Sequence, residues 1–376
     1  MIYFDNSATT PVREEILDVV QEVLRNHFGN PSSIHSLGMD TQRLFKNARN
    51  QIAGFLKVDP GEIVFTSGGT ESNNTAVFGA LGGEAGGHAI TTQFEHASVI
   101  EAFKVLESRG FEVTWIKPDA SGHVAPEAVE GALRKNTRLV SLIHVNNEIG
   151  TIQPIEAVGR ILKNHPRTVF HVDGVQSFGK IPVDLKAAGI DLFSFSGHKI
   201  HAYKGIGGLY INRKRRLQPL LFGGDQEGGF RPGTENLPGI VSLGEAVGHQ
   251  QRQLSAASDR VMKISCVILE GLGEIKGLRF NGGPPKTPYI QSVSFRGIPS
   301  EVLLHALEEE GLFVSSGSAC HSRRSSVSHV LRAIEVPKEY IEGTLRLSYS
   351  SMNTLEEARE AVDIIKRTHE RISSYL

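Results

Sequence analysis

The sequence predicts an α/β fold in which a large domain, built on a mostly parallel sheet, is joined to a smaller α+β domain. Three observations support this prediction. Short apolar runs alternate with helical segments from about residue 60 to about residue 250. Beyond that point, longer helical segments surround isolated strand-like runs. Finally, a chain of 376 residues has room for one large domain and a smaller one.

The predicted elements follow in order along the chain. The first is a helix over residues 12–24, whose apolar positions recur at helical spacing until Gly29 and Pro31 end it. Seven strand-like runs then cover residues 63–65, 89–91, 111–116, 139–143, 169–172, 191–195 and 208–211. Intervening segments such as 99–108 and 155–164 are predicted to be helices. This succession is typical of a mostly parallel seven-stranded sheet with helices on both faces.

The C-terminal part of the chain has a different pattern. Helical segments cover residues 254–272, 301–310 and 354–376, and strand-like runs cover residues 291–295 and 345–349. This mixture predicts a small α+β domain, which the first dozen residues join. We therefore assign residues 15–255 to the large domain, and residues 1–14 and 256–376 to the small domain.

Composition and charge exclude several classes of protein. The net charge is −1 and 39% of residues are hydrophobic, as in a globular protein that binds neither nucleic acid directly nor membranes. The basic run at residues 213–216 is interpreted as a solvated loop. No apolar run is long enough to span a bilayer, and the first residues do not resemble a signal peptide. We therefore expect a cytoplasmic protein.

The sequence contains 2 cysteines, Cys266 and Cys320. Their number excludes a disulfide framework and a cysteine-rich zinc site. Cys266 lies among apolar residues of a helical segment, so we interpret it as a packing residue. Cys320 lies in a segment of small and polar residues and is followed by His321, Arg323 and Arg324. Such surroundings favour an exposed thiolate.

Asp173 and Lys199 are the most informative pair in the sequence. Asp173 follows the strand-like run 169–172, and Lys199 follows the run 191–195. Binding sites in parallel sheets lie beyond the carboxyl ends of the strands, so both side chains are expected at one site. Pyridoxal phosphate needs such a pair, because a lysine forms its Schiff base and a carboxylate keeps its pyridine nitrogen protonated. Without Asp173, Lys199 would be interpreted as a solvated lysine beside a core histidine.

Other motifs can supply the rest of such a site. Residues 67–72, Ser-Gly-Gly-Thr-Glu-Ser, open a predicted helix, where backbone amides bind phosphate well. His96 can stack on a flat ring and relay protons, and Gln176 can donate a hydrogen bond to the ring oxygen. Ser196 and His198 can contact the phosphate. The alternative for the glycine-containing segment that starts at Ser67 is an ordinary turn, and the alternative for His96 is a structural histidine.

Two further positions concern the substrate. The amides of residues 146–150 can bind a substrate carboxylate or the phenolic oxygen of the cofactor, although a polar turn is the alternative. Arg346 is a charged residue in a strand-like run. A bidentate ion pair with a substrate carboxylate would explain a charge at this position. The alternative is an edge-strand arginine facing water. His198 and His201 have metal-ligand spacing but lack a third ligand, so no metal site is predicted.

Together these motifs resemble the cysteine desulfurases of the NifS/IscS type, in the class V aminotransferase group of pyridoxal-phosphate enzymes. The resemblance runs essentially from end to end and implies the transferase fold type I. It is carried by residues 4–10, 29–33, 66–74, 146–150, 173–180, 194–199, 231–234, 316–320 and 346–348.

The resemblance also implies a reaction. L-Cysteine would be converted to L-alanine, and its sulfur would be held by Cys320 as a persulfide and passed to an acceptor protein. The catalytic residues would be Cys320, Lys199, which carries the cofactor, and His96, which stacks on the ring. The segment around Cys320 resembles the longer-loop group, which mainly supplies sulfur for iron–sulfur cluster assembly, through a scaffold protein, or for tRNA thiolation.

A set of binding residues is implied in the same way. The cofactor would be contacted by Gly69, Thr70, His96, Asn147, Asp173, Gln176, Ser196, His198, Lys199 and Thr234. Thr234 would reach the phosphate of the other subunit, so the resemblance implies a homodimer with shared sites. Asn147 and Arg346 would bind the substrate, and Arg346 would hold its carboxylate.

Three alternatives remain at this point. A selenocysteine lyase of the same fold would keep Cys320 but would have little activity on cysteine. An aminotransferase of the same fold would not need Cys320. A cofactor-holding scaffold without turnover would be expected to lack Lys199, Asp173, His96 or Cys320.

Overall fold

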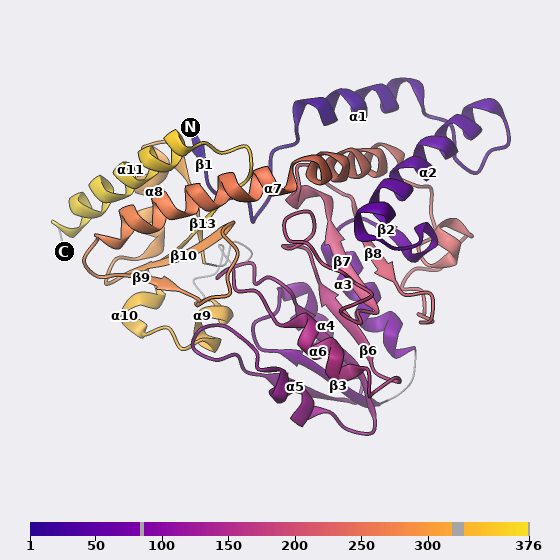
Figure 1. The fold of residues 1–376 in the computed structure, drawn as a ribbon, viewed down its shortest axis with the longest axis horizontal. Coiled ribbons are helices and arrows are strands. Elements are labelled where there is room, and N and C mark those ends of the chain that lie inside the picture. Colours follow the sequence, from indigo (N-terminus) through magenta and orange to yellow (C-terminus); the bar gives the residue numbers. More distant parts are fainter. Residues whose placement is uncertain (83–85, 318–326, 375–376) are drawn as a thin grey trace.

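A seven-stranded sheet forms the centre of the larger part of the molecule (Figure 1). The structure is a computed structural model that describes residues 1–82, 86–317 and 327–374, so Cys320 lies outside the described residues. The strand order is β2-β8-β7-β6-β5-β3-β4. The strands are β2 (Ile63–Thr66), β3 (Gly87–Thr92), β4 (Phe111–Ile116), β5 (Thr137–Ile143), β6 (Val169–Asp173), β7 (Leu192–Ser196) and β8 (Gly207–Ile211). Only β8 runs antiparallel to its neighbours among these strands, which confirms the predicted mostly parallel sheet.

Helices cover both faces of this sheet, because neighbouring residues of a strand point to opposite faces and both faces are apolar. In β5, Leu139 belongs to one buried cluster and Val140 to another. The first cluster includes α3 (Gly69–Leu81) and α4 (Ala97–Ser108). The second includes α1 (Glu14–Asn26), α2 (Ser36–Leu56), α5 (Pro126–Ala132), α6 (Ile155–Leu162) and part of α7 (Leu237–Gly273).

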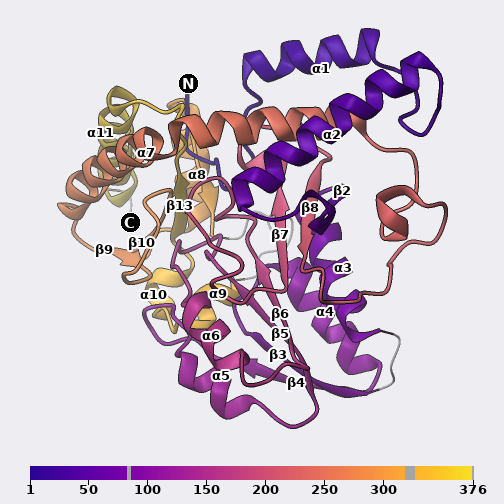
Figure 2. The ribbon, with the colours of Figure 1, turned by 45° about the vertical axis from the view of Figure 1, so that its right-hand side comes forward.

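The 37-residue helix α7 runs through both parts of the molecule (Figure 2). Ile240 and Leu243 belong to the apolar cluster on one face of the large sheet, whereas Ile264 and Ile268 belong to the apolar core of the smaller part. The sequence pattern predicted this helix only from residue 254, because glycines such as Gly244 weaken the helical signal further upstream. The predicted domain boundary at residue 255 therefore falls inside α7.

Helix α2 was missed by the sequence analysis. Before Ile52, its buried residues are small or polar, namely Gly38, Thr41 and Ala48. An apolar helical period is therefore visible only near its end. Small residues allow α2 to approach α7 closely, since a Cβ atom added at Gly244 would lie 2.9 Å from the Cα atom of Ala48.

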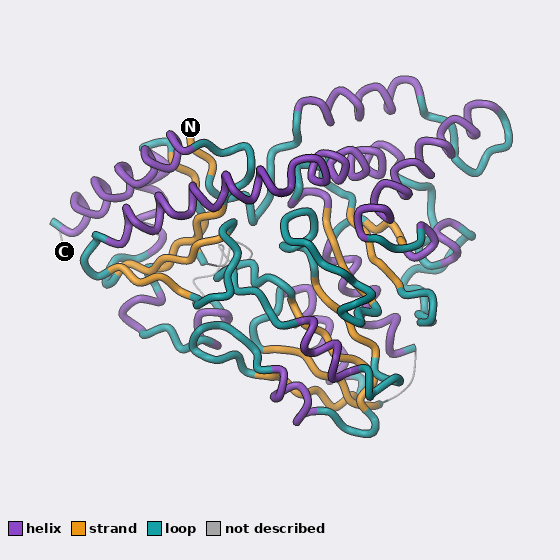
Figure 3. The backbone as a smooth tube through the Cα atoms, in the orientation of Figure 1, coloured by secondary structure: helices purple, strands orange, loops and turns teal. Residues whose placement is uncertain are grey.

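The smaller part of the molecule is a four-stranded antiparallel sheet in the order β12-β13-β10-β9 (Figure 3). Its strands are β9 (Leu278–Asn281), β10 (Ile290–Phe295), β12 (Ser315–Ser316) and β13 (Thr344–Ser348). Its helices are α8 (Ser300–Glu309), α9 (His329–Ala333), α10 (Lys338–Ile341) and α11 (Leu355–Ser373). Strand β1 (Ile2–Tyr3) pairs in parallel with β11 (Leu312–Phe313), which places the first residues beside this sheet. No helix in the described ranges has the length and apolarity needed to cross a membrane.

The interpretation of Cys266 as a packing residue was wrong. Cys266 is exposed on α7. The buried side of the helix at this level carries Ile264 and Ile268. Cys266 lies two residues from each of them, which is about 200° around the helix axis and therefore on the opposite side.

Candidate active site

A pocket of about 340 Å³ lies at the carboxyl ends of the parallel strands, where the two parts of the molecule meet. The predicted site residues that line it are Gly69, Thr70, His96, Asn147, Asp173, Gln176, Ser196, His198, Lys199 and Arg346. Thr234 is exposed and does not line the pocket. Cys320 lies outside the described residues.

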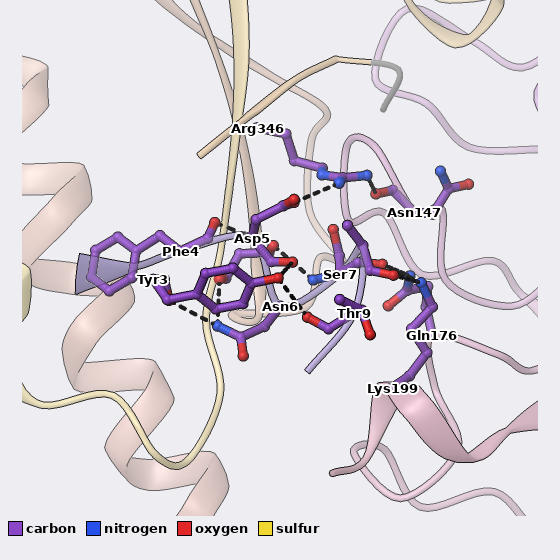
Figure 4. A network of polar contacts seen from close by, with 12 residues as sticks. Tyr3, Phe4, Asp5, Asn6, Ser7, Thr9, Asn147, Gln176, Lys199 and Arg346 are labelled. Atoms are coloured by element: carbon purple, nitrogen blue, oxygen red, sulfur yellow. Dashed lines mark hydrogen bonds and ion pairs between the residues drawn. The ribbon is translucent and has the colours of Figure 1, made fainter. Parts of the chain in front are cut away.

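Asp173 and Lys199 face this pocket from neighbouring strands of the sheet. Asp173 is the last residue of β6, and its Oδ1 accepts a hydrogen bond from the amide of Val175 at 3.0 Å. Lys199 lies in a short 3₁₀ helix, η2 (Gly197–Lys199), directly after β7. Its Nζ donates to the carbonyl oxygens of Ser7 at 2.5 Å and Ala8 at 2.6 Å (Figure 4). The segment after β1 therefore forms one wall of the site.

The start of α3 forms a cradle of small residues. Gly68 has φ +153°, a conformation that other residues rarely adopt. A Cβ atom at Gly69 would lie 2.7 Å from Cγ2 of Val175, so this position excludes larger residues. Ser196 Oγ is buried without a hydrogen-bond partner in the described part of the chain. Free amides at a helix start beside an unpartnered hydroxyl suit a phosphate group.

Among the described histidines that line the pocket, His96 and His198 are held in their neutral forms. Burial lowers the pKa of His96, and burial followed by the charge of Lys199 lowers the pKa of His198 to about 3. His96 Nδ1 accepts a hydrogen bond from the amide of Ser98 at 3.2 Å and lies 2.8 Å from Ser98 Oγ. His198 Nδ1 lies 3.2 Å from Thr9 Oγ1. Neutral rings of this kind can stack on a cofactor and form hydrogen bonds without adding charge.

Both the nitrogen and the oxygen of the Gln176 side-chain amide form hydrogen bonds. Its Nε2 donates to the carbonyl of Ser7 at 3.0 Å, and its Oε1 lies 3.4 Å from Nζ of Lys180. Lys180 is buried, and this burial lowers its pKa to about 8. The amide of Gln176 thus has a fixed orientation at the wall of the pocket.

The amides of residues 146–150 do not behave as the sequence analysis expected. The amides of Glu148 and Ile149 donate to Asn146 Oδ1 at 2.9 and 3.0 Å, and the amide of Gly150 donates to the Asn146 carbonyl. These three donors are used within the turn and cannot serve a ligand. The turn presents two side chains to the pocket, those of Asn147 and Glu148. Asn147 Oδ1 is buried and has no hydrogen-bond partner among the described residues.

Arg346 is buried in the middle of the small sheet, since β13 lies between β12 and β10. The alternative of an edge-strand arginine facing water was therefore wrong. Its Nη1 donates to the carbonyl of Asn147 at 3.1 Å, and its Nη2 forms an ion pair with Asp5 Oδ1 at 2.8 Å (Figure 4). Its Nε has no partner in the described ranges.

The sequence analysis missed several residues that complete the pocket. Ser7, Ala8, Asn73, Ser98 and Glu148 all line it. Glu148 is fully buried, which raises its pKa to about 7, and its Oε2 accepts a hydrogen bond from Ser328 Oγ at 2.5 Å. Asn73 and Ser98 lie on α3 and α4 at positions that carry no local sequence signal for function. Only the approach of the two helices brings them together.

Known proteins are similar to this chain over nearly its whole length. The sequence model of the family described as Aminotransferase class-V matches residues 2–360. A cysteine desulfurase IscS from Methanosarcina thermophila is 42% identical over 367 residues, which make up 97% of this chain and 91% of that protein. A solved structure of a NifS-like protein has a TM-score of 0.92 and 37% identity and covers 100% of both chains. The structure titled "SspA in complex with cysteine" has a TM-score of 0.83 and 38% identity, covering 93% of this chain and 98% of that one.

The chain therefore belongs to the class-V aminotransferase family, whose members are pyridoxal-phosphate enzymes of fold type I. Within that family it belongs to the cysteine desulfurases of the NifS/IscS type. The predictions of fold class and cofactor are confirmed.

The residues of the pocket fit this cofactor. The cradle before α3 and the unpartnered Ser196 Oγ can hold a phosphate, and the carboxylate of Asp173 can hold a protonated pyridine nitrogen. The amine of Lys199 faces the same pocket and can bond the cofactor. When bound, pyridoxal phosphate supplies an electron sink for negative charge at the α-carbon of the substrate.

Proposed function

We propose that this enzyme converts L-cysteine to L-alanine and holds the sulfur on Cys320 as a persulfide. The observation that carries the proposal is the single pocket in which Lys199, Asp173 and Arg346 meet. Two of these residues come from the large sheet or the turn that follows it, and Arg346 comes from the small sheet. A related structure is titled as a complex with cysteine, which supports an amino-acid substrate of this size.

The proposed reaction balances without an added oxidant. The C–S bond of cysteine breaks, its electron pair stays with the β-carbon, and that carbon gains a proton to give alanine. A new S–S bond forms between the substrate sulfur and the Cys320 thiolate. The carbon is thus reduced, and the two sulfurs are oxidised together to the level of a persulfide.

The binding residues have distinct proposed roles. Asp173 holds the pyridine nitrogen, Lys199 bonds the cofactor, and Gln176 and Asn147 contact its ring or the substrate. The phosphate is held by Gly69, Thr70, Ser196 and His198. The neutral His96 stacks on the ring.

Arg346 is proposed to bind the substrate carboxylate together with Asn147. A guanidinium offers several hydrogen-bond donors in a fixed plane, which match the two oxygens of a carboxylate. Arg346 is buried, and its Nη2 is already paired with a carboxylate, that of Asp5. The buried Oδ1 of Asn147 supplies an acceptor nearby for the substrate amine.

We further propose that the enzyme acts as a homodimer whose sites are shared. Thr234 is exposed and lies outside the pocket of its own chain, as expected of a residue that serves the other subunit. Large apolar side chains are also exposed on this chain, including Phe28 (73%), Ile34 (95%) and Phe222 (86%). Exposure of this kind is typical of a surface that another chain covers. Sedimentation equilibrium measures the mass directly, and a monomer at micromolar concentration would contradict the proposal.

The persulfide is proposed to pass to an acceptor protein in the cytoplasm, either a scaffold for iron–sulfur cluster assembly or an enzyme of tRNA thiolation. The IscS name carried by relatives supports a role in sulfur supply. Transfer of radioactive sulfur from labelled cysteine to each purified acceptor would distinguish the two pathways. Labelling of neither acceptor would contradict this part of the proposal.

The central experiment compares wild type with Cys320→Ala, using Cys266→Ala as the matched control. Alanine and sulfide release from L-cysteine is measured in the presence of a thiol reductant. We expect release by wild type and by Cys266→Ala, whose thiol is exposed on α7, and none by Cys320→Ala. Release that survives in Cys320→Ala would favour the lyase or aminotransferase alternatives. Activity only on selenocysteine would favour a selenocysteine lyase.

A further inference from the structure

We propose that Ser98 and Asn73 are positioning residues, which fix His96 as a neutral ring with its proton on Nε2 and connect it to Asp173. The four side chains form one continuous hydrogen-bonded chain from Asp173 through Asn73 and Ser98 to His96. The effect on turnover rests on the proposed function, whereas the protonation of His96 can be measured independently.

The orientation of Asn73 is determined by its neighbours. Its Nδ2 lies 2.8 Å from Asp173 Oδ2 and 2.9 Å from Ser98 Oγ. A carboxylate can only accept hydrogen bonds, so the atom of Asn73 that faces Asp173 must be the amide nitrogen. This nitrogen carries two protons, and the second is donated to Ser98 Oγ.

The hydroxyl of Ser98 then has one proton left to donate. Its Oγ lies 2.8 Å from His96 Nδ1, so the proton is donated there. The main-chain amide of Ser98 also donates to Nδ1, at 3.2 Å, because His96 is the N-cap of α4. With two donors directed at it, Nδ1 carries no proton, and the neutral ring must carry its proton on Nε2.

Burial leaves these side chains few alternative hydrogen-bond partners. Asn73, Asp173 and Ser98 expose 1%, 2% and 9% of their surface, so water cannot readily replace a missing partner. Burial also lowers the pKa of His96, which keeps the ring neutral. A protonated ring would have a proton on Nδ1 and would face two donors there.

The consequence concerns what His96 offers to the reaction. The ring lines the pocket, its Nδ1 is engaged by Ser98, and Nε2–H is the polar group that remains for a bound molecule. His96 therefore acts as a hydrogen-bond donor to an acceptor in the pocket, not as an acceptor of the substrate proton at Nε2. Asn73 at the same time supplies the second of two donors to the carboxylate of Asp173.

The test is a set of variants on the cofactor-loaded enzyme. Ser98→Ala removes the hydroxyl, Ser98→Thr keeps it, and Ser108→Ala is the matched control at the exposed end of the same helix. Asn73→Leu removes the donor to Asp173 at nearly constant volume. Nitrogen-15 NMR of labelled histidine reports which ring nitrogen of His96 is protonated, with the His96→Gln variant giving the assignment.

We expect wild type, Ser98→Thr and Ser108→Ala to show a protonated Nε2 and an unprotonated Nδ1. In Ser98→Ala we expect a mixture of the two tautomers and a higher pKa of His96, because a donor to the neutral ring is lost. We expect kcat for alanine formation to fall about tenfold in Ser98→Ala and to be restored in Ser98→Thr, with KM little changed. Asn73→Leu should weaken cofactor retention on dialysis.

A proton on Nδ1 in wild type would overturn the proposal, as would a Ser98→Ala variant with unchanged tautomer, pKa and kcat. If wild type forms no alanine, the proposed function fails while the NMR result still decides the role of Ser98. Thermal unfolding of each variant distinguishes loss of positioning from loss of the fold.

Discussion

Arg346 Nη2 lies 2.8 Å from Asp5 Oδ1, which joins the middle strand of the small sheet to the segment that follows β1. The same guanidinium donates through Nη1 to the carbonyl of Asn147, which belongs to the turn after β5. One side chain thus connects three segments around the pocket. Arg346 is buried and already pairs with the carboxylate of Asp5. For binding a second carboxylate, that of the substrate, its planar set of donors is therefore more important than its charge alone.

The first prediction concerns Arg346→Lys. Lysine keeps the positive charge but cannot donate from a planar fork to two oxygens of a carboxylate. We expect the KM for L-cysteine to rise about tenfold or more, which corresponds to at least about 1.4 kcal/mol of lost binding. Steady-state kinetics measure this effect, and Arg359→Lys on the exposed face of α11 is the matched control. A KM equal to that of wild type would exclude Arg346 from substrate binding.

The second prediction concerns Gly69→Ala at the start of α3. The new methyl group would lie 2.7 Å from Cγ2 of Val175, a stiff side chain that follows Asp173 by two residues. The strand-to-helix turn must then widen, so we expect cofactor affinity to fall about tenfold while the protein stays folded. Titration of the apo-protein with pyridoxal phosphate, followed by absorbance, gives the dissociation constant. Gly54→Ala, where no atom lies within 4 Å of the added group, should bind as wild type does.

The third prediction concerns Gly244→Ala, where α7 crosses α2. Alanine is the better helix former by about 1 kcal/mol, but the new Cβ would lie 2.9 Å from backbone and side-chain atoms of Ala48. The two helices must separate, at a cost of about 1–3 kcal/mol, so the net effect is destabilising. Urea unfolding measures it against Gly273→Ala, which has open space around the new methyl group. Greater stability in Gly244→Ala than in wild type would show that the helices can adjust freely.

Much of this architecture follows from local sequence patterns. The strands of the large sheet are recognisable because both of their faces are buried, which leaves continuous apolar runs such as Ile63 to Phe65. The pairing of Asp173 with Lys199 could be predicted because the carboxyl ends of parallel strands share one edge of the sheet. Neither inference requires knowledge of distant contacts.

Other features depend on tertiary contacts and have no local signal. The carbonyl of Ser7 meets Lys199 only because β1 pairs with a strand more than 300 residues away in the sequence. The link between Asn73 and Ser98 depends on how α3 packs on α4. The turn after β5 looked like a ligand-binding segment because its polar residues are the same ones that satisfy its own amides.

The fourth prediction concerns the dependence of stability on pH. Glu95, directly before His96, is fully buried, and this burial raises its pKa to about 8. Its Oε1 accepts hydrogen bonds from Thr92 Oγ1 at 2.7 Å and from the amide of Ile143 at 3.0 Å. Its Oε2 has no partner in the described part of the chain. The side chain is therefore held as a neutral acid within the fold.

A raised pKa in the folded state determines the sign of the effect. Between the ordinary value of 4.5 and about 8, the folded protein keeps a proton that the unfolded chain has released. The contribution of Glu95 to the free energy of unfolding therefore falls as pH rises through this range, by at most about 1.4 kcal/mol per pH unit. Glu95→Gln cannot ionise, so its stability relative to wild type should increase from about pH 5 to about pH 8. Urea unfolding at both pH values measures the difference, with Glu101→Gln on the exposed face of α4 as control. Parallel pH profiles for wild type and Glu95→Gln would show that Glu95 is ionised in the folded protein.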